Sequence, residues 1–105
     1  MKLREIAHSR TGDKGNTSNI SVIAYDPVHY PLLEKHVTVE RVKALFSEIV
    51  EGDVVRYTLP NIGALNFVMY KALGGGVTRT LAIDLHGKSL SSAILEIEIH
   101  NDQGL

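Results

Sequence analysis

The chain has 105 residues, of which 44% are hydrophobic and 22% charged, as in an ordinary globular domain and unlike a disordered or coiled-coil chain. Its 11 basic and 12 acidic residues are scattered and give a formal charge of -1. This distribution excludes the large positive patch that binds nucleic acid or an anionic membrane. The lack of cysteine excludes disulfides, thiolate nucleophiles and sulfur-bound metals.

Targeting and linker signals are weak throughout the sequence. The first ten residues, MKLREIAHSR, carry charges at positions 2, 4 and 5 and lack the apolar run of a secretory signal. No apolar stretch approaches membrane-spanning length, and no repeat or Gly/Ser/Pro-rich run divides the chain. We therefore expect one domain over residues 1–105 and a cytoplasmic location.

The first half of the chain predicts two strands followed by a helix. Leu3 to Ser9 and the β-branched segment Asn19 to Tyr25 suit strands, and the polar run Arg10 to Asn19 is expected to join them as a loop. Pro31 permits a fresh helical start, and Thr38 suits the N-cap of a helix. The apolar residues after this cap recur at three- and four-residue spacing: Val39, Val42, Leu45, Phe46 and Ile49.

The middle of the chain predicts a third strand and a second helix. Asp53 to Leu59 alternates as a strand, with Val55, Tyr57 and Leu59 on one face. Asn61 is expected to cap a helix from Ile62 to Leu73, which Gly74 to Gly76 end. On this helix three residues flank the core stripe: Phe67, Val68 and Tyr70. Either they contact another chain, or Phe67 packs under a loop of this one.

Two more strands complete the predicted fold. Thr78 to Leu85 is expected to be the fourth strand. His86 to Lys88 are expected to form a turn, and the segment that follows the turn, up to His100, is expected to be the fifth strand. In the fifth strand Leu95, Ile97 and Ile99 face the core, and Glu96, Glu98 and His100 face solvent. The order predicts an α+β fold, a ferredoxin-like two-layer sandwich with a mainly antiparallel sheet of about five strands and two helices on one face.

Candidate site residues gather first in the run Arg10 to Asn19. Arg10 and Lys14 supply positive charge, and Gly12 and Gly15 let backbone N–H groups converge on an anion. The run is longer than a tight hairpin needs, yet the GxxxxGK[ST] spacing of a phosphate-binding loop is absent. An anion site and a plain solvated hairpin loop are both compatible with these residue types.

Two further runs offer groups for an anion. Asn61 and Asn66 bracket the start of the predicted second helix, whose free N–H groups attract a carboxylate or phosphate, although capping alone also explains Asn61. In GGGVTR, Gly75 permits close backbone approach and Arg79 can clamp a carboxylate. No histidine pair with helical metal-ligand spacing and no nucleophile elbow is present, so no metal and no cofactor are predicted.

The three runs RTGDKGNTSNI, LPNIGALNFV and LGGGVTRTLAID together resemble the small C-terminal domain of the acyclic terpene utilisation protein AtuA family. The resemblance extends from Ile6 to Ile99 and implies a ferredoxin-like fold. In fused members this domain follows a larger domain linked by name to the breakdown of acyclic terpenoid acyl compounds. Thr11 and Asn16 stand where serine and aspartate are common. The residues that match the pattern are Arg10, Gly12, Asp13, Lys14, Gly15, Asn19, Asn61, Asn66, Gly75 and Arg79.

These observations lead us to expect an accessory small subunit or binding domain that works with a larger AtuA-like protein in acyl or terpenoid acid catabolism. The alternative is a homo-oligomeric enzyme or binding protein that acts on a small carboxylate or acyl-CoA. Asp13, Lys14 and His8 are the candidate catalytic residues of that alternative. We expect a homo-oligomer or a hetero-complex with the larger subunit, and neither nucleic acid nor membrane as a partner.

Overall fold

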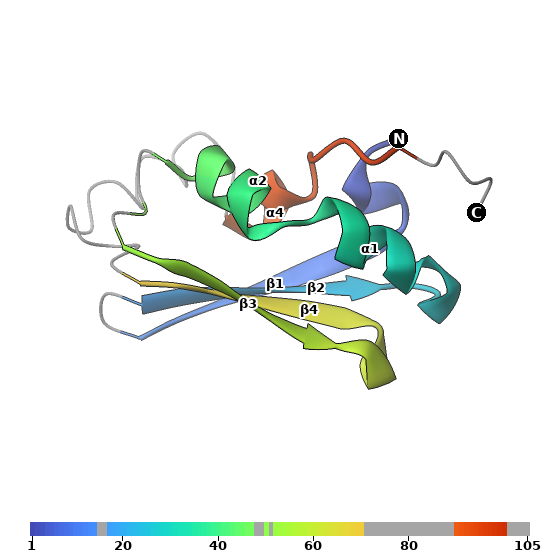
Figure 1. The fold of residues 1–105 in the computed structure, drawn as a ribbon, viewed down its shortest axis with the longest axis horizontal. Helices are drawn as coiled ribbons and strands as arrows, with labels where there is room; N and C mark the ends of the chain where they lie inside the picture. The colour runs from blue at the N-terminus through green and yellow to red at the C-terminus, as the bar shows by residue number, and fades with distance from the viewer. Residues whose placement is uncertain (15–16, 48–49, 51, 71–89, 101–105) are drawn as a thin grey trace.

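The structure, a computed structural model, describes residues 1–14, 17–47, 50, 52–70 and 90–100. Within these ranges one four-stranded sheet carries three α-helices on one of its faces (Figure 1). The strands are β1 (Ala7–Lys14), β2 (Thr17–Ala24), β3 (Val54–Leu59) and β4 (Ala64–Met69). The α-helices are α1 (Tyr30–His36), α2 (Val39–Leu45) and α4 (Leu90–Ile94), and the 3-10 helices are η1 (Leu3–Glu5), η2 (Pro27–His29) and η3 (Pro60–Ile62).

The sheet has the order β1-β2-β4-β3, and all its neighbouring strands are antiparallel. Since β2 and β3 both run antiparallel to β4, they are parallel to each other, and α1 and α2 connect them around the inserted β4. This is the split β-α-β unit of the ferredoxin-like fold. The usual element order is β-α-β-β-α-β, whereas this chain begins with the hairpin β1–β2, so the strand that usually comes last comes first.

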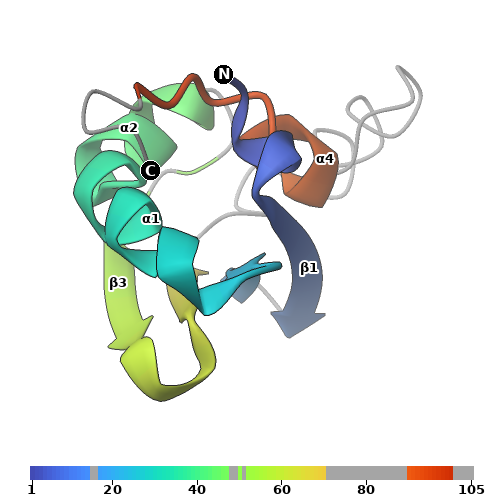
Figure 2. The same ribbon diagram turned by 90° about the vertical axis from the view of Figure 1, so that its right-hand side faces the viewer.

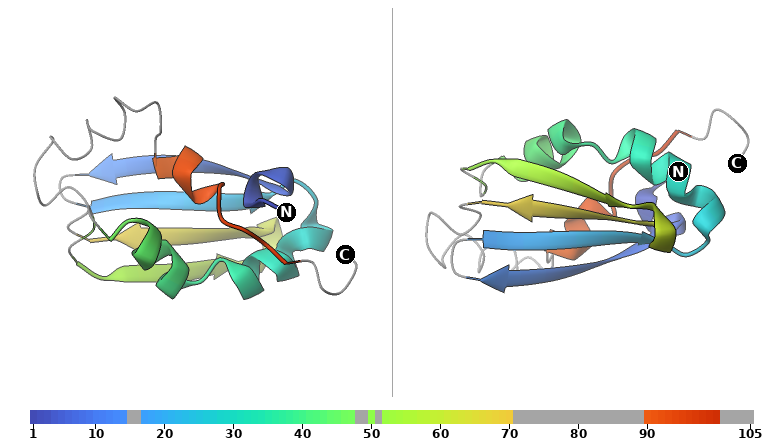
Figure 3. Two further views of the ribbon diagram at one scale, coloured as in Figure 1. Left: turned by 90° about the horizontal axis from the view of Figure 1, so that it is seen from above. Right: turned by 60° about the horizontal axis from the view of Figure 1, so that its bottom comes forward.

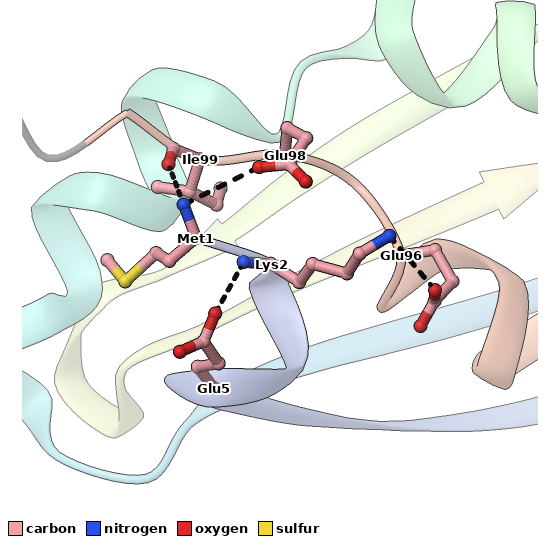
Figure 4. A network of polar contacts seen from close by, with 6 residues as sticks. All are labelled: Met1, Lys2, Glu5, Glu96, Glu98 and Ile99. Atoms are coloured by element: carbon pink, nitrogen blue, oxygen red, sulfur yellow. Dashed lines mark hydrogen bonds and ion pairs between the residues drawn. The ribbon is translucent and has the colours of Figure 1, made fainter.

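The two ends of the described chain lie side by side, as this permuted order requires. The amide of Leu3 donates to the carbonyl of Ile97 at 2.8 Å, and the amide of Ile99 donates to the carbonyl of Met1 at 2.7 Å. Around this short antiparallel contact Lys2 Nζ lies 3.2 Å from Glu96 Oε1 (Figure 4). The segment after α4 is therefore attached to the residues that lead into β1.

The hydrophobic core lies between the sheet and the helices (Figure 2). Strand β2 alternates strictly between buried and half-buried residues, which directs Ile20 and Val22 inward. Phe67 of β4 and Leu33 of α1 are fully buried against them. Burying each such side chain contributes about 1.5–3 kcal/mol, so these contacts hold the two layers together.

The predicted second helix, Ile62 to Leu73, is wrong over its described part, because Ala64–Met69 forms strand β4. Gly63 has a φ of 64°, a left-handed conformation that turns the chain back so that Ala64 pairs with Leu59. The apolar residues fit a helical period, but burial follows the alternation Leu65, Phe67, Met69. Phe67 is consequently a core residue and not an exposed flank for another chain.

The other differences concern the ends of strands. The predicted loop Arg10 to Asn19 is wrong, because Arg10 to Lys14 belong to β1 and Thr17 to Asn19 to β2, with Lys14 paired to Thr17. Cross-strand hydrogen bonds to β2 pair one side of the backbone of the edge strand β1, and these bonds form whether or not the side chains are apolar. Strand β1 starts only at Ala7, because Leu3–Glu5 forms η1.

The predicted fifth strand is wrong, because Leu90–Ile94 forms α4 and the residues after it contribute one isolated β-bridge, from Glu98 to Lys2. The described sheet therefore has four strands and not about five. The inward positions of Ile97 and Ile99 are confirmed, and Glu98 and His100 are exposed as predicted. The predicted strand Thr78 to Leu85 lies outside the described residues. The third strand is confirmed as β3, and Thr38 caps α2 by accepting a hydrogen bond from the Arg41 amide at 3.2 Å.

Candidate functional site

The face of the sheet that points away from the helices is covered by none of the described elements (Figures 1 and 3). We call it the open face. Strand alternation and register assign to it the outward residues of each strand. They are His8, Arg10 and Gly12 of β1, Thr17, Asn19, Ser21 and Ile23 of β2, Ala64, Asn66 and Val68 of β4, and Val55, Tyr57 and Leu59 of β3.

The middle of the open face carries a row of polar side chains that crosses all four strands. Cross-strand pairing aligns Arg10 with Ser21, Ser21 with Asn66, and Asn66 with Tyr57. We call these four residues the donor row. The Ser21 hydroxyl donates to Asn66 Oδ1 at 3.3 Å. This bond uses the acceptor end of the Asn66 amide and leaves its NH2 group as a donor on the face.

Beside the donor row, Gly12 and Asn19 are cross-strand partners. A Cβ atom on residue 12 would lie 2.7 Å from Asn19 Oδ1, closer than such atoms can approach. Glycine at this position therefore leaves room for the Asn19 side chain to lie over β1. On the other face of the sheet, the Ser18 hydroxyl donates to the Gly12 carbonyl at 3.1 Å, which holds this part of the hairpin in place.

One end of the open face is apolar. Ile23, Ala64 and Leu59 are aligned across three strands, with Tyr25 after β2 and Ile62 at the tip of the β3–β4 connection; we call these five residues the apolar end. Only 1% of Ala64 is exposed, whereas Tyr25 is 66% and Ile62 64% exposed. An exposed apolar cluster of this kind is typical of a binding surface.

The open face also differs in charge from the rest of the domain. By strand alternation, none of its residues named above is acidic, although the whole chain has 12 acidic residues. Arg10 is exposed, and no side chain that the structure describes forms an ion pair with it. This face therefore favours a negatively charged group over a positive one.

The structure brings together four of the predicted ligand-binding residues: Arg10, Gly12, Asn19 and Asn66 come from three strands and share the open face. Asn61 does not cap an α-helix as expected; it is exposed in η3. Asp13 and Lys14 are placed by their backbone pairing in β1. Gly15, Gly75 and Arg79 lie outside the described residues.

Catalytic groups are less evident on this face. The His8 ring packs on Tyr25 with a centroid separation of 5.1 Å, which is a ring contact and not a hydrogen bond between an acid and a base. Among the described residues, no group of three or more His, Asp or Glu side chains could hold a metal ion. Burial raises the pKa of Tyr30 and lowers that of His36, but both residues belong to α1 on the helix side.

The sequence-based reasoning missed Ser21, Tyr57 and the apolar end. Alternation along a strand from Asn19 to Tyr25 puts Ser21 and Ile23 on one side, but it cannot show which residues of distant strands lie beside them. The register of β2 with β4 and of β4 with β3 makes that connection.

Comparison with known proteins adds one finding. Residues 1–100 match the family model described as the AtuA ferredoxin-like domain. No match was found among curated proteins or among solved structures. Within the described part of the chain, no helix has the length and apolar character needed to cross a membrane.

Proposed function

The chain belongs to the AtuA ferredoxin-like domain family, and on this premise we propose that it is an accessory binding domain that works with a larger AtuA-like protein. The process that the two serve is acyl or terpenoid acid catabolism. The observation that carries the proposal is the open face, where a donor row and an apolar end lie side by side on the side of the sheet that no described element covers.

The chemistry of this face supports binding more than catalysis. The donor row offers a guanidinium, an amide and two hydroxyl groups, all of which can orient a ligand through hydrogen bonds. A catalytic site needs a nucleophile or an acid and a base within hydrogen-bond reach of each other. The described contact of His8 is ring packing on Tyr25, which is not the hydrogen-bonded pair that acid–base catalysis requires.

The apolar end supports contact with a second protein. Tyr25, Leu59 and Ile62 are exposed, and all three lie at the same end of the sheet. Covering such a cluster removes apolar area from water, which is the main driving force of protein association. A larger AtuA-like protein is the partner that family membership favours.

Sedimentation of the chain with a purified larger AtuA-like protein tests the proposal. We expect a complex, and we expect Leu59→Asp to weaken it at least tenfold, because a carboxylate would be buried among apolar side chains. Leu45→Asp is the matched control, since Leu45 and Leu59 are both 41% exposed but Leu45 lies on α2, on the helix side.

Three other outcomes would change the conclusion. Equal loss of the complex in both variants would mean that the open face is not the interface. No complex with the wild-type chain would remove the accessory role. A self-associated chain that Leu59→Asp converts to a monomer would favour the alternative, a homo-oligomeric protein that binds a small carboxylate or acyl-CoA.

A further inference from the structure

We propose that the open face binds an amphiphilic monocarboxylic acid, with the carboxylate on the donor row and the apolar body along the apolar end. This proposal rests on the proposed function, because the ligand that it names binds the same open face. It is argued from the placement of the donors, the charge of the face and the position of the apolar residues.

The donor row provides a place for a carboxylate above Ser21. Adjacent strands are about 4.8 Å apart, so Ser21 separates the backbones of Arg10 and Asn66 by about 10 Å in total. The long arginine side chain can cover much of that distance, and its planar guanidinium matches the two oxygens of a carboxylate. On the other side, the bond from the Ser21 hydroxyl to Asn66 Oδ1 leaves the Asn66 NH2 group to donate to the same carboxylate.

The charge of the face selects the headgroup. Arg10 is exposed, has no ion-pair partner among the described side chains, and lies on a face whose assigned residues include no acid. One guanidinium balances the single negative charge of a carboxylate, whereas a phosphate carries about 1.5–2 negative charges at pH 7. A second copy of this face offers no carboxylate to Arg10 either, so charge complementarity favours an acidic ligand over self-pairing.

The apolar end lies where the body of the ligand has to go. Ile23, Ala64 and Leu59 are each two residues along their strands from the donor row, a distance of about 6.6 Å. From β2 to β3 this apolar row extends about 10 Å across the sheet and continues to Ile62. An acid with a short apolar chain can therefore hold its headgroup on the donor row and cover the apolar end at the same time.

The test is a titration of the ¹⁵N-labelled chain with sodium acetate, hexanoate and octanoate, followed by amide chemical shifts. We expect the largest shifts in β1, β2 and β4, and an affinity that rises with chain length by at most about fourfold per methylene group. Octanol and octylamine, which have the same apolar body with no charge and with a positive charge, should bind much more weakly than octanoate.

Arg10→Gln should lower the affinity for octanoate by about 10- to 100-fold, the range for loss of one charge-assisted hydrogen-bonded contact. Arg4→Gln is the matched control. It removes the same charge from an exposed arginine of η1, on the other side of the domain, and should leave octanoate binding within about twofold of wild type. Asn66→Ala should produce an intermediate loss, because its NH2 group is one of the proposed donors.

Several results would overturn the proposal: no octanoate binding by the chain alone or with the larger protein, equal binding of octanol, or equal losses in the two arginine variants. A response to octanoyl-CoA without one to octanoate would show that a free carboxylate is not the group recognised. If octanoate binds in an Arg10-dependent way but no complex with the larger protein forms, the accessory role is wrong and the proposal of a carboxylic acid ligand is supported. A complex that forms while octanoate fails to bind would do the reverse.

Discussion

Replacing Arg56 by methionine tests how the helical layer is held on the sheet. Arg56 lies on β3, and its Nη1 atom donates to the carbonyl of Glu34 at 2.8 Å and to the carbonyl of Val37 at 2.9 Å. These carbonyls belong to the last turn and the C-cap of α1. Carbonyls at a helix C-terminus lack partners within the helix and carry partial negative charge, so a guanidinium is well suited to them.

The expected loss follows from the two bonds. Hydrogen bonds to a charged group contribute about 1.5–3 kcal/mol, and water can replace the bond to the exposed Glu34 carbonyl more easily than the part-buried bond to Val37. Arg56→Met keeps the apolar stem of the side chain, so we expect a loss of about 2 kcal/mol in the free energy of unfolding. At about 4–8 °C per kcal/mol for a domain of this size, the Tm should fall by roughly 8–16 °C.

Urea unfolding followed by circular dichroism measures this loss, with an unchanged m-value as the sign that only stability has changed. Arg10→Met is the control. Arg10 is exposed on the open face, so this substitution should change the unfolding free energy by less than about 0.5 kcal/mol. If Arg56→Met is as harmless as Arg10→Met, the two hydrogen bonds do not hold α1 on the sheet and the reasoning is wrong.

Three further variants test the strand assignment, a close contact between two backbone segments and a titrating group. Phe67→Ala should lower the unfolding free energy by about 3–5 kcal/mol and Val68→Ala by much less, because only Phe67 faces the core; similar losses in urea unfolding would contradict β4. Gly52→Ala should reduce the Tm, since its Cβ would lie 2.6 Å from the Tyr70 carbonyl oxygen, and a calorimetric scan that matches wild type would contradict that contact. Burial and neighbouring cations lower the pKa of His36 below 6.5, so its contribution to stability is complete above pH 6.5 and is lost as the pH falls through the lower, folded-state value. His36→Gln should flatten this part of the pH profile of urea midpoints, and an unchanged slope would assign the effect to other groups.

The chemistry of the open face also explains why its residues looked like a loop site. Arg10, Gly12 and Asn19 are polar or small, which is common in loops, but the same types suit the outward side of a hairpin. The residue types were therefore misleading about backbone conformation, and the binding role that they indicate stays a prediction. Gly12 shows the difference, because it leaves space for Asn19 and does not supply a turn.

Local signals in the sequence determined the elements that depend on neighbouring residues. Thr38 accepts from the Arg41 amide within the same turn, so the start of α2 could be predicted from residue types alone. The alternation of Val54–Leu59 likewise predicted β3, and the outward placement of Glu98 beside the buried Ile97 and Ile99 followed from the same period of two.

Only the tertiary structure decided the identity of β4 and the composition of the site. The apolar residues of Ala64–Met69 satisfy both a helical and a strand period, and what selects the strand is hydrogen bonding on both sides, to β2 and β3. The same pairing puts Arg10, Ser21, Asn66 and Tyr57 in one row, although up to 56 positions separate them in the chain. Periodicity reports which side of its own strand a residue occupies, whereas its neighbours across the sheet depend on register, which is set by contacts between distant segments.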